Sequence, residues 1–298
     1  MFVIIYSPVL VFMIYYLLSV LERGSNMSLQ LILGGSGSGK TTFLYDKIIR
    51  SSIEHPDRQY FLIVPEQFTM QAQKDIVSAH PGHGTMNIDI VSFNRLAYRI
   101  FEELAVAKLQ VLDDMGKSMV LRKVAAAQKK KLGLFSGHLS QTGFINQMKS
   151  QLSEFYQYGI TPDTLREMAP LAGSPLLKQK LEDLSVVFTA FQDYIREHYE
   201  NGVVSEQVLD ILCKVIPDSG LLKNSVIALD GYTGFTPVQY RLAELFMVYA
   251  RQVVVTVTAD PEISMYRSMG VQNLFYMSRQ MTVRLLSLIH ISEPTRRS

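Results

Sequence analysis

Residues 34–41 read Gly-Gly-Ser-Gly-Ser-Gly-Lys-Thr and match the pattern G-x-x-x-x-G-K-[ST]. The motif follows the apolar run Leu29–Leu33 and precedes the helix-compatible stretch Thr42–Arg50, which predicts strand, loop and helix in that order. In such a loop, backbone N–H groups turn toward phosphate oxygens, Lys40 reaches the β and γ phosphates, and the Thr41 hydroxyl ligates Mg²⁺. The motif therefore predicts a bound nucleoside triphosphate. Its expected ligands are Gly34, Gly35, Ser36, Gly37, Ser38, Gly39, Lys40, Thr41 and Thr42.

The composition is that of a globular protein. The chain has 298 residues, of which 48% are hydrophobic and 19% charged, enough for one large or two small domains. Its single cysteine, Cys213, excludes a disulfide framework and an all-cysteine metal site within these residues, so a cytoplasmic location is expected. The formal net charge of +2 neither supports nor excludes a nucleic-acid partner.

Both ends of the chain differ from the sequence between them. Met1–Leu21 holds no charged residue and, at about 20 apolar residues, is long enough to span a bilayer. However, Met27 stands just before the first core strand, and Glu22-Arg23-Gly24 can be encoded by a ribosome-binding sequence. We therefore interpret residues 1–26 as a translated upstream leader, with an apolar anchor as the alternative, and expect no membrane partner. Residues 287–298 resemble a translated sequencing adapter and are interpreted as an artefactual tail.

Strand and helix patterns alternate on both sides of a long helical stretch. Apolar runs at Tyr60–Val64 and Asn87–Val91 are each followed by a helical pattern, which extends the first strand and helix to three β-α units. Strand character returns at Ser225–Leu229 and Gln252–Val257, with a helix predicted between them at Pro237–Ala250. Repeated β-α units predict a parallel sheet. The intervening stretch reads as amphipathic helices at residues 115–131, 141–158, 174–199 and 205–215.

The predicted fold class is α/β. Residues 27–110 and 222–286 are expected to form one P-loop domain with a doubly wound parallel sheet. Residues 111–221 are expected to form an all-α subdomain inserted into it.

Asp230 is the candidate catalytic carboxylate. It follows the strand Val226–Leu229, at the sheet edge where ligands of open α/β folds gather. A nucleotide hydrolase needs a carboxylate there to hold Mg²⁺, so Asp230 and Thr41 are the predicted metal-linked pair. The alternative is an aspartate that caps the turn at Gly231.

The order of these segments resembles the first motor domain of the UvrD-like superfamily 1 DNA helicases. Residues 34–41 match the first motif of that family, and Asp260–Tyr266 is similar to its third. Together with Ile63–Thr69, Val91–Leu96 and Leu229–Gln239, these motifs resemble the B-subunit family of the bacterial AddAB (RexAB) ATP-dependent helicase/nucleases, over residues 27–286. The resemblance implies a RecA-like domain in the amino-terminal part of a much longer subunit, with ATP and Mg²⁺ as cofactors.

Departures from the helicase pattern bear on hydrolysis. Gly231 replaces the glutamate that would polarise water, and Ile263 replaces the glutamine that would sense the γ-phosphate. Gly34 follows Met27 so closely that the upstream glutamine segment, which grips adenine in that family, has no room. The resemblance therefore predicts ATP·Mg²⁺ binding with weak or absent hydrolysis and weak base selectivity.

The resemblance also implies partners. In the AddAB family a motor A subunit pairs with the B subunit in double-strand break repair by recombination, and the B subunit helps to hold unwound DNA. An iron-sulfur cluster and a nuclease belong to the distant carboxy-terminal part of that subunit. Single-stranded and double-stranded DNA are therefore expected partners. The candidate DNA contacts are Gln67, Phe68, Thr69, Ser92, Phe93 and Arg95. For Phe68 and Phe93, a place in the core is the favoured interpretation, because both also fit helical core faces.

Two other functions stay open at this level. A small-molecule P-loop kinase, or another NTPase, would use Lys40 and Thr41 in the same way, although the sequence has no recognisable acceptor pocket or lid arginine pair. A membrane-anchored nucleotide-binding protein would use Met1–Leu21 as its anchor.

Overall fold

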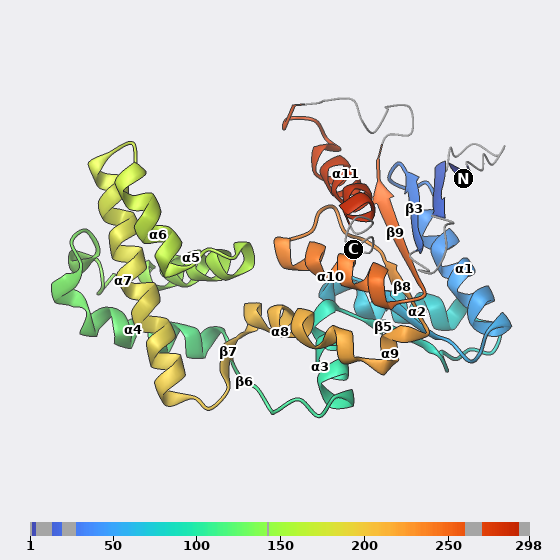
Figure 1. Ribbon diagram of the computed structural model, residues 1–298, viewed down its shortest axis with the longest axis horizontal. Coiled ribbons are helices and arrows are strands. Elements are labelled where there is room, and N and C mark those ends of the chain that lie inside the picture. Colours follow the sequence, from blue (N-terminus) through green and yellow to red (C-terminus); the bar gives the residue numbers. More distant parts are fainter. Residues whose placement is uncertain (1, 4–13, 20–27, 142, 260–269, 292–298) are drawn as a thin grey trace, which may run out of the picture. The chain divides into compact units, whose positions relative to one another are not determined.

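A computed structural model describes residues 2–3, 14–19, 28–141, 143–259 and 270–291. The chain forms two compact units (Figure 1). The first unit contains the phosphate-loop motif, and the second is mostly helical. Their bounds are Met1–Ala105, Leu212–Phe235 and Gln239–Ser298 for the first unit, and Val106–Ile211 and Thr236–Val238 for the second.

A seven-stranded sheet forms the centre of the first unit. Five of its strands are parallel, in the order β3-β9-β8-β4-β5, and β2 and β1 continue the sheet antiparallel beyond β3. Because β8 and β9 lie between β3 and β4, the segments before and after the second unit share one sheet. This confirms the predicted α/β fold. The strands are β1 (Phe2–Val3), β2 (Ile14–Ser19), β3 (Ser28–Gly34), β4 (Gln59–Ile63), β5 (Ile88–Val91), β8 (Ser225–Leu229) and β9 (Gln252–Thr258).

Helices cover both faces of the parallel strands. On one face, Ile32 and Leu62 pack with Leu44 of α1 (Lys40–Glu54) and Ile76 of α2 (Thr69–Ala79). Figure 1 shows α10 (Pro237–Tyr249) and α11 (Tyr276–Ile291) on the other side of the strands from α1. α3 (Phe93–Glu103) contacts α10 through a stacked aromatic pair. The two-sided covering explains why these strands read as continuous apolar runs.

The second unit contains a small sheet as well as helices. Strands β6 (Gln110–Leu112) and β7 (Gly202–Val204) form a parallel pair, so the expectation of an all-α insertion is corrected here. Strands of three residues are too short to give an alternating pattern in the sequence. The helices are α4 (Asp114–Ala127), α5 (Phe144–Tyr158), α6 (Pro162–Met168) and α7 (Pro175–His198); α8 (Val208–Val215) and α9 (Gly220–Lys223) follow on the way to β8.

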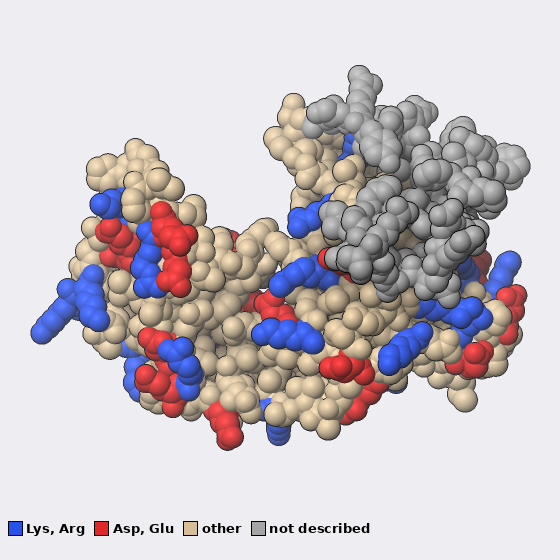
Figure 2. Space-filling view, in the orientation of Figure 1, with Lys and Arg blue, Asp and Glu red and all other residues tan. Residues whose placement is uncertain are grey.

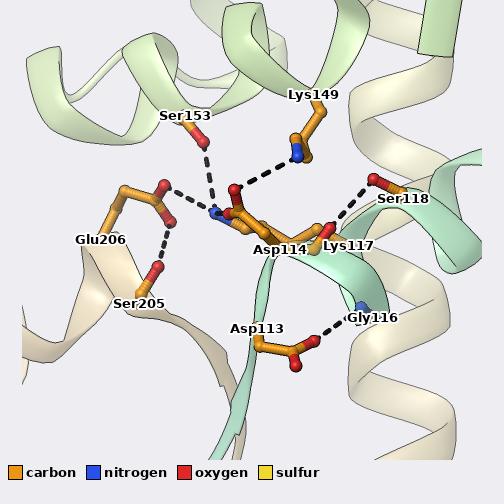
Figure 3. Close-up of polar contacts among 9 residues, drawn as sticks. All are labelled: Asp113, Asp114, Gly116, Lys117, Ser118, Lys149, Ser153, Ser205 and Glu206. Atoms are coloured by element: carbon orange, nitrogen blue, oxygen red, sulfur yellow. Dashed lines mark hydrogen bonds and ion pairs between the residues drawn. The ribbon is translucent and has the colours of Figure 1, made fainter. Parts of the chain in front are cut away.

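A buried ion pair connects three segments of the second unit (Figure 3). Lys117 of α4, with 6% of its side chain exposed, donates to Glu206 Oε1 at 2.9 Å and to Ser153 Oγ of α5 at 3.4 Å. Asp114 pairs with both Lys117 and Lys149. Burial lowers the pKa of Lys117, but its hydrogen bonds to Glu206 and Asp114 hold that pKa above its ordinary value. Burial raises the pKa of Glu206, but hydrogen bonds from Ser153 and Lys117 hold it below its ordinary value.

The structure describes only parts of the two predicted foreign ends. In the predicted leader, residues 2–3 and 14–19 form β1 and β2. α11 continues to Ile291, within the predicted tail, and residues 292–298 lie outside the described part of the chain. Among the residues that the structure describes, no helix combines the length and the apolar character needed to cross a membrane.

Candidate nucleotide site

The loop between β3 and α1 has a backbone that requires glycine. Gly37 and Gly39 have φ angles of 73° and 81°, in the left-handed region that strains other residues. At Gly34, an added Cβ would lie 2.5 Å from Ser38 Oγ, so a side chain would displace the Ser38 hydroxyl. The loop is therefore folded tightly back on the end of β3.

The amino-terminal end of α1 offers unpaired donors. Gly39 is the N-cap and provides no side-chain cap, and the first turn of the helix has no acidic residue. The first N–H groups of the helix and its dipole are thus available to an anion. Ser38 Oγ is buried. Among the buried side-chain nitrogen and oxygen atoms of the described residues, it is the one without a hydrogen-bond partner. These donors, together with the space that Gly34 leaves, fit a phosphate group.

Lys40 folds back into this loop. Its side chain is buried, and Nζ donates a hydrogen bond of 2.6 Å to the carbonyl oxygen of Gly35. Burial lowers the pKa of Lys40, and the nearby charge of Asp230 partly opposes this effect. The lysine therefore sits inside the loop, next to the predicted catalytic carboxylate.

Asp230 lies at the carboxyl end of β8, at the same sheet edge as the loop. Its backbone N–H donates to the carbonyl of Ile63 on β4 at 3.0 Å. Its side chain is buried, and Oδ1 accepts hydrogen bonds from Thr41 Oγ1 at 3.3 Å and from Thr256 Oγ1 on β9. The structure thus brings the predicted pair Thr41 and Asp230 together. Sequence reasoning missed Thr256, although a threonine within the valine run of β9 was a visible signal.

The donor set of the site fits a magnesium-bound triphosphate. A hydroxyl and a carboxylate oxygen are the kinds of ligand that Mg²⁺ takes in nucleotide sites. Thr41 and Asp230 supply them, while Lys40 and the glycine loop supply the groups that bind phosphate. Thr42, also predicted as a ligand, is exposed in the first turn of α1.

Gly231 occupies the position at which the helicase pattern has glutamate. Its φ angle is 80°, and an added Cβ would lie 3.4 Å from Cδ of Pro65. The next residue, Tyr232, packs edge-on against Phe93 and Phe235, and burial raises its pKa. The chain therefore turns sharply at the site where a water-polarising side chain would project. The other predicted departure, Ile263, lies outside the described residues.

The six candidate DNA contacts divide by exposure. Gln67 and Arg95 are exposed, and Arg95 pairs with Glu66 at 3.2 Å. Phe68 is 51% exposed, so its placement in the core is wrong. Phe93 is 4% exposed and packs with aromatic rings of the first unit, as favoured.

The last two candidates, Thr69 and Ser92, are buried and hydrogen-bond to the backbone. Thr69 Oγ1 donates to the carbonyl of Glu66 at 2.9 Å. Ser92 Oγ caps α3 by accepting from the N–H of Arg95. Of the candidates, Gln67, Phe68 and Arg95 are therefore the ones that present side chains at the surface.

A parallel α/β sheet whose first core strand ends in this loop defines the P-loop class of α/β proteins. Within that class, the family model described as ADDB, N-terminal, matches residues 31–294, and the chain belongs to this family.

Curated relatives share one description, in which each is the B subunit of an ATP-dependent helicase/deoxyribonuclease. The protein from Lachnoclostridium phytofermentans is 45% identical over 263 residues, which cover 88% of this chain and 23% of that relative. The protein from Caldanaerobacter subterraneus subsp. tengcongensis is 33% identical over 273 residues, which cover 90% of this chain and 23% of that relative. The protein from Clostridium kluyveri is 33% identical over 234 residues, which cover 78% of this chain and 20% of that relative. The chain thus spans no more than 23% of the length of these relatives.

Proposed function

We propose that the first unit binds ATP with Mg²⁺ and hydrolyses it weakly or not at all. The supporting observation is the convergence of Lys40, Thr41 and Asp230 at one edge of the sheet. Lys40 would exchange the Gly35 carbonyl for phosphate oxygens, and the N–H groups of the glycine loop would bind the same phosphates. Thr41 and Asp230 would hold Mg²⁺, which neutralises phosphate charge when bound.

The proposal of weak hydrolysis follows from the turn at Gly231. Phosphoryl transfer to water needs a group that orients the attacking water, and this position has only a backbone in the left-handed region. In other hydrolases, loss of a single group that stabilises the transition state lowers turnover by about a hundredfold or more. The groups that bind phosphate do not depend on it, so binding is retained while hydrolysis is lost.

We further propose that the chain is part of the B subunit of a cytoplasmic helicase/nuclease complex that repairs double-strand breaks by recombination. The family membership and the names of the relatives support this role. A motor-containing A subunit would be its partner, and an iron-sulfur cluster is expected only in the remainder of such a subunit.

Single-stranded DNA would contact the sheet edge at Gln67, Phe68 and Arg95. On the face drawn in Figure 2, positive and negative side chains of the described residues are interspersed. Exposed aromatic and polar side chains can stack on unpaired bases and contact the nucleic-acid backbone. The exposed ring of Phe68 is the candidate for such stacking.

A Lys40→Ala variant tests the proposed function, with Lys74→Ala as a control at an exposed lysine of α2. Calorimetry on the full chain should show ATP·Mg²⁺ binding by the wild type and the control, and none by Lys40→Ala. In the assembled complex, Lys40→Ala should leave unwinding largely intact. Brisk ATP hydrolysis by the wild-type chain, absence of ATP binding by it, or collapse of unwinding in the variant would each contradict the proposal.

A further inference from the structure

Thr256 is a polar residue in the middle of an apolar strand. β9 reads Gln-Val-Val-Val-Thr-Val-Thr from Gln252 to Thr258, and only 4% of Thr256 is exposed. Its register partner on β3 is Ile32, which belongs to the core beneath α1 together with Val254. A valine has the same branched shape and would fill this space without burying a hydroxyl. Packing alone therefore does not explain a threonine here.

The hydroxyl of Thr256 is directed to the nucleotide site. β9 lies between β3, which leads into the phosphate loop, and β8, which ends at Asp230. Leu229 pairs in register with Val255, so the next residue on each strand brings Asp230 beside Thr256. Thr256 Oγ1 donates to Asp230 Oδ1, the same oxygen that accepts from Thr41 Oγ1.

The two hydroxyl donors to this oxygen come from different parts of the fold. Thr41 belongs to the phosphate loop and is exposed, whereas Thr256 belongs to the sheet and is buried. A donor on a central strand is fixed by the strand ladders on both sides of it, so it can orient Asp230 before any ligand arrives. A hydrogen bond to a charged group is also stronger than one between neutral groups.

The geometry points to Thr256 as a positioning residue that orients Asp230 for the magnesium-dependent part of nucleotide binding. This inference rests on the proposed function of the site. Thr256 bonds to the carboxylate of Asp230, whereas Lys40, the proposed phosphate ligand, bonds to the Gly35 carbonyl. The affinity for the phosphates and the affinity gained through Mg²⁺ therefore depend on different residues. Thr256 should affect the gain in affinity that Mg²⁺ provides, and should leave the affinity for metal-free ATP unchanged.

The test measures ATP affinity of the full chain in Mg²⁺ and in EDTA for Thr256→Val, Thr256→Ser and the wild type. In Thr256→Val the gain from Mg²⁺ should fall about tenfold, because one hydrogen bond to a charged group is lost. Thr256→Ser keeps the hydroxyl and should restore most of the gain. Affinity in EDTA should be equal in all three proteins, an outcome that a purely structural role would not produce.

The outcomes separate this inference from the proposed function. If the wild type binds no ATP in Mg²⁺ or in EDTA, both the proposed function and the role of Thr256 are overturned. A wild type with a clear gain from Mg²⁺, and a Thr256→Val variant with the same gain, overturns the role of Thr256 alone. Thermal melting checks that the variants are folded, and Thr256→Ala provides a second side chain without a hydroxyl if Thr256→Val does not fold.

Discussion

Thr41 Oγ1 donates a hydrogen bond of 3.3 Å to Asp230 Oδ1 across 189 residues of sequence. The contact depends on the sheet topology. β3, β9 and β8 are adjacent and parallel, so their carboxyl ends share one edge of the sheet. The contact connects the glycine-rich loop, which the sequence motif identifies, with the carboxylate of Asp230, which lies outside that motif.

Two neighbouring glycines of the loop should respond differently to alanine. Gly34→Ala places a methyl group 2.5 Å from Ser38 Oγ, whereas at Gly35 nothing lies within 4 Å of an added Cβ. Gly34→Ala should weaken ATP·Mg²⁺ binding by about tenfold, since the Ser38 hydroxyl is displaced and the side chain of Lys40 is crowded. Gly35→Ala should stay within about twofold of the wild type. Calorimetry on both variants measures the difference, and equal losses would mean that the close approach at Gly34 has no role.

Restoring the missing carboxylate should not restore hydrolysis. Gly231 has a φ angle of 80° and lies against Pro65, so Gly231→Glu should destabilise the chain by about 1–2 kcal/mol without placing its carboxylate on the site. Gly231→Asn is the matched control, since asparagine tolerates this backbone. Denaturant unfolding and phosphate release measure the two effects. A large rise in ATP turnover in Gly231→Glu would show that the turn does not prevent catalysis.

Two phenylalanines that follow strands should have opposite roles. Phe93 is buried among aromatic rings, so Phe93→Ala should lose about 3–5 kcal/mol of unfolding free energy. Phe68 is half exposed, so Phe68→Ala should change stability by about 0.5 kcal/mol or less. If Phe68 stacks on bases, its alanine variant should bind single-stranded oligonucleotides about tenfold more weakly. Fluorescence anisotropy provides this measurement, and unchanged binding would remove Phe68 from the DNA contacts.

The ion pair of the second unit should limit its stability at both ends of the pH scale. Glu206 has a pKa below its ordinary 4.5, so its contribution is present above pH 4.5 and is lost as the pH falls through the folded value. Lys117 has a pKa above its ordinary 10.5, so its contribution is present below pH 10.5 and is lost as the pH rises through the folded value.

Glu206→Gln should therefore destabilise the second unit by about 1–3 kcal/mol at neutral pH, because Lys117 loses its buried partner and keeps only the exposed carboxylate of Asp114. It should also make the decline of stability below pH 4.5 shallower. Asp163→Asn, which breaks the exposed pair with Arg166, is the control and should do neither. Circular dichroism during denaturant unfolding at several pH values measures both effects. A variant as stable as the wild type would mean that the pair contributes no net stability.

The sequence predicted the sheet better than the details of its edge. Each parallel strand was visible, because burial on both faces leaves nearly unbroken apolar runs such as Val226–Leu229. The loop and Asp230 were predictable since their chemistry dictates residue type and place. The exposure of Phe68 and Phe93 was not predictable. An apolar side chain that follows a strand can lie in the core or at the surface, and the position of the neighbouring helices decides which. Thr256 was missed because its partner belongs to another strand.

The second unit shows a different limit. Its long helices follow from apolar periodicity, but α6 has only 7 residues and β6 and β7 have 3 each. Elements this short carry almost no periodic signal and depend on contacts that the rest of the unit provides. The predicted limits of the insertion, residues 111–221, stay a prediction about domains.

The strand order also has a consequence for synthesis on the ribosome. β3 and β4 are made early, but the two strands that separate them in the finished sheet, β8 and β9, are translated only after residues 106–211 of the second unit. Until then the nascent chain carries a phosphate loop without its carboxylate, and the inner edges of β3 and β4 have no neighbours to pair with. Under the proposed function, magnesium-dependent nucleotide binding would become possible only after about 190 further residues have been added beyond the loop.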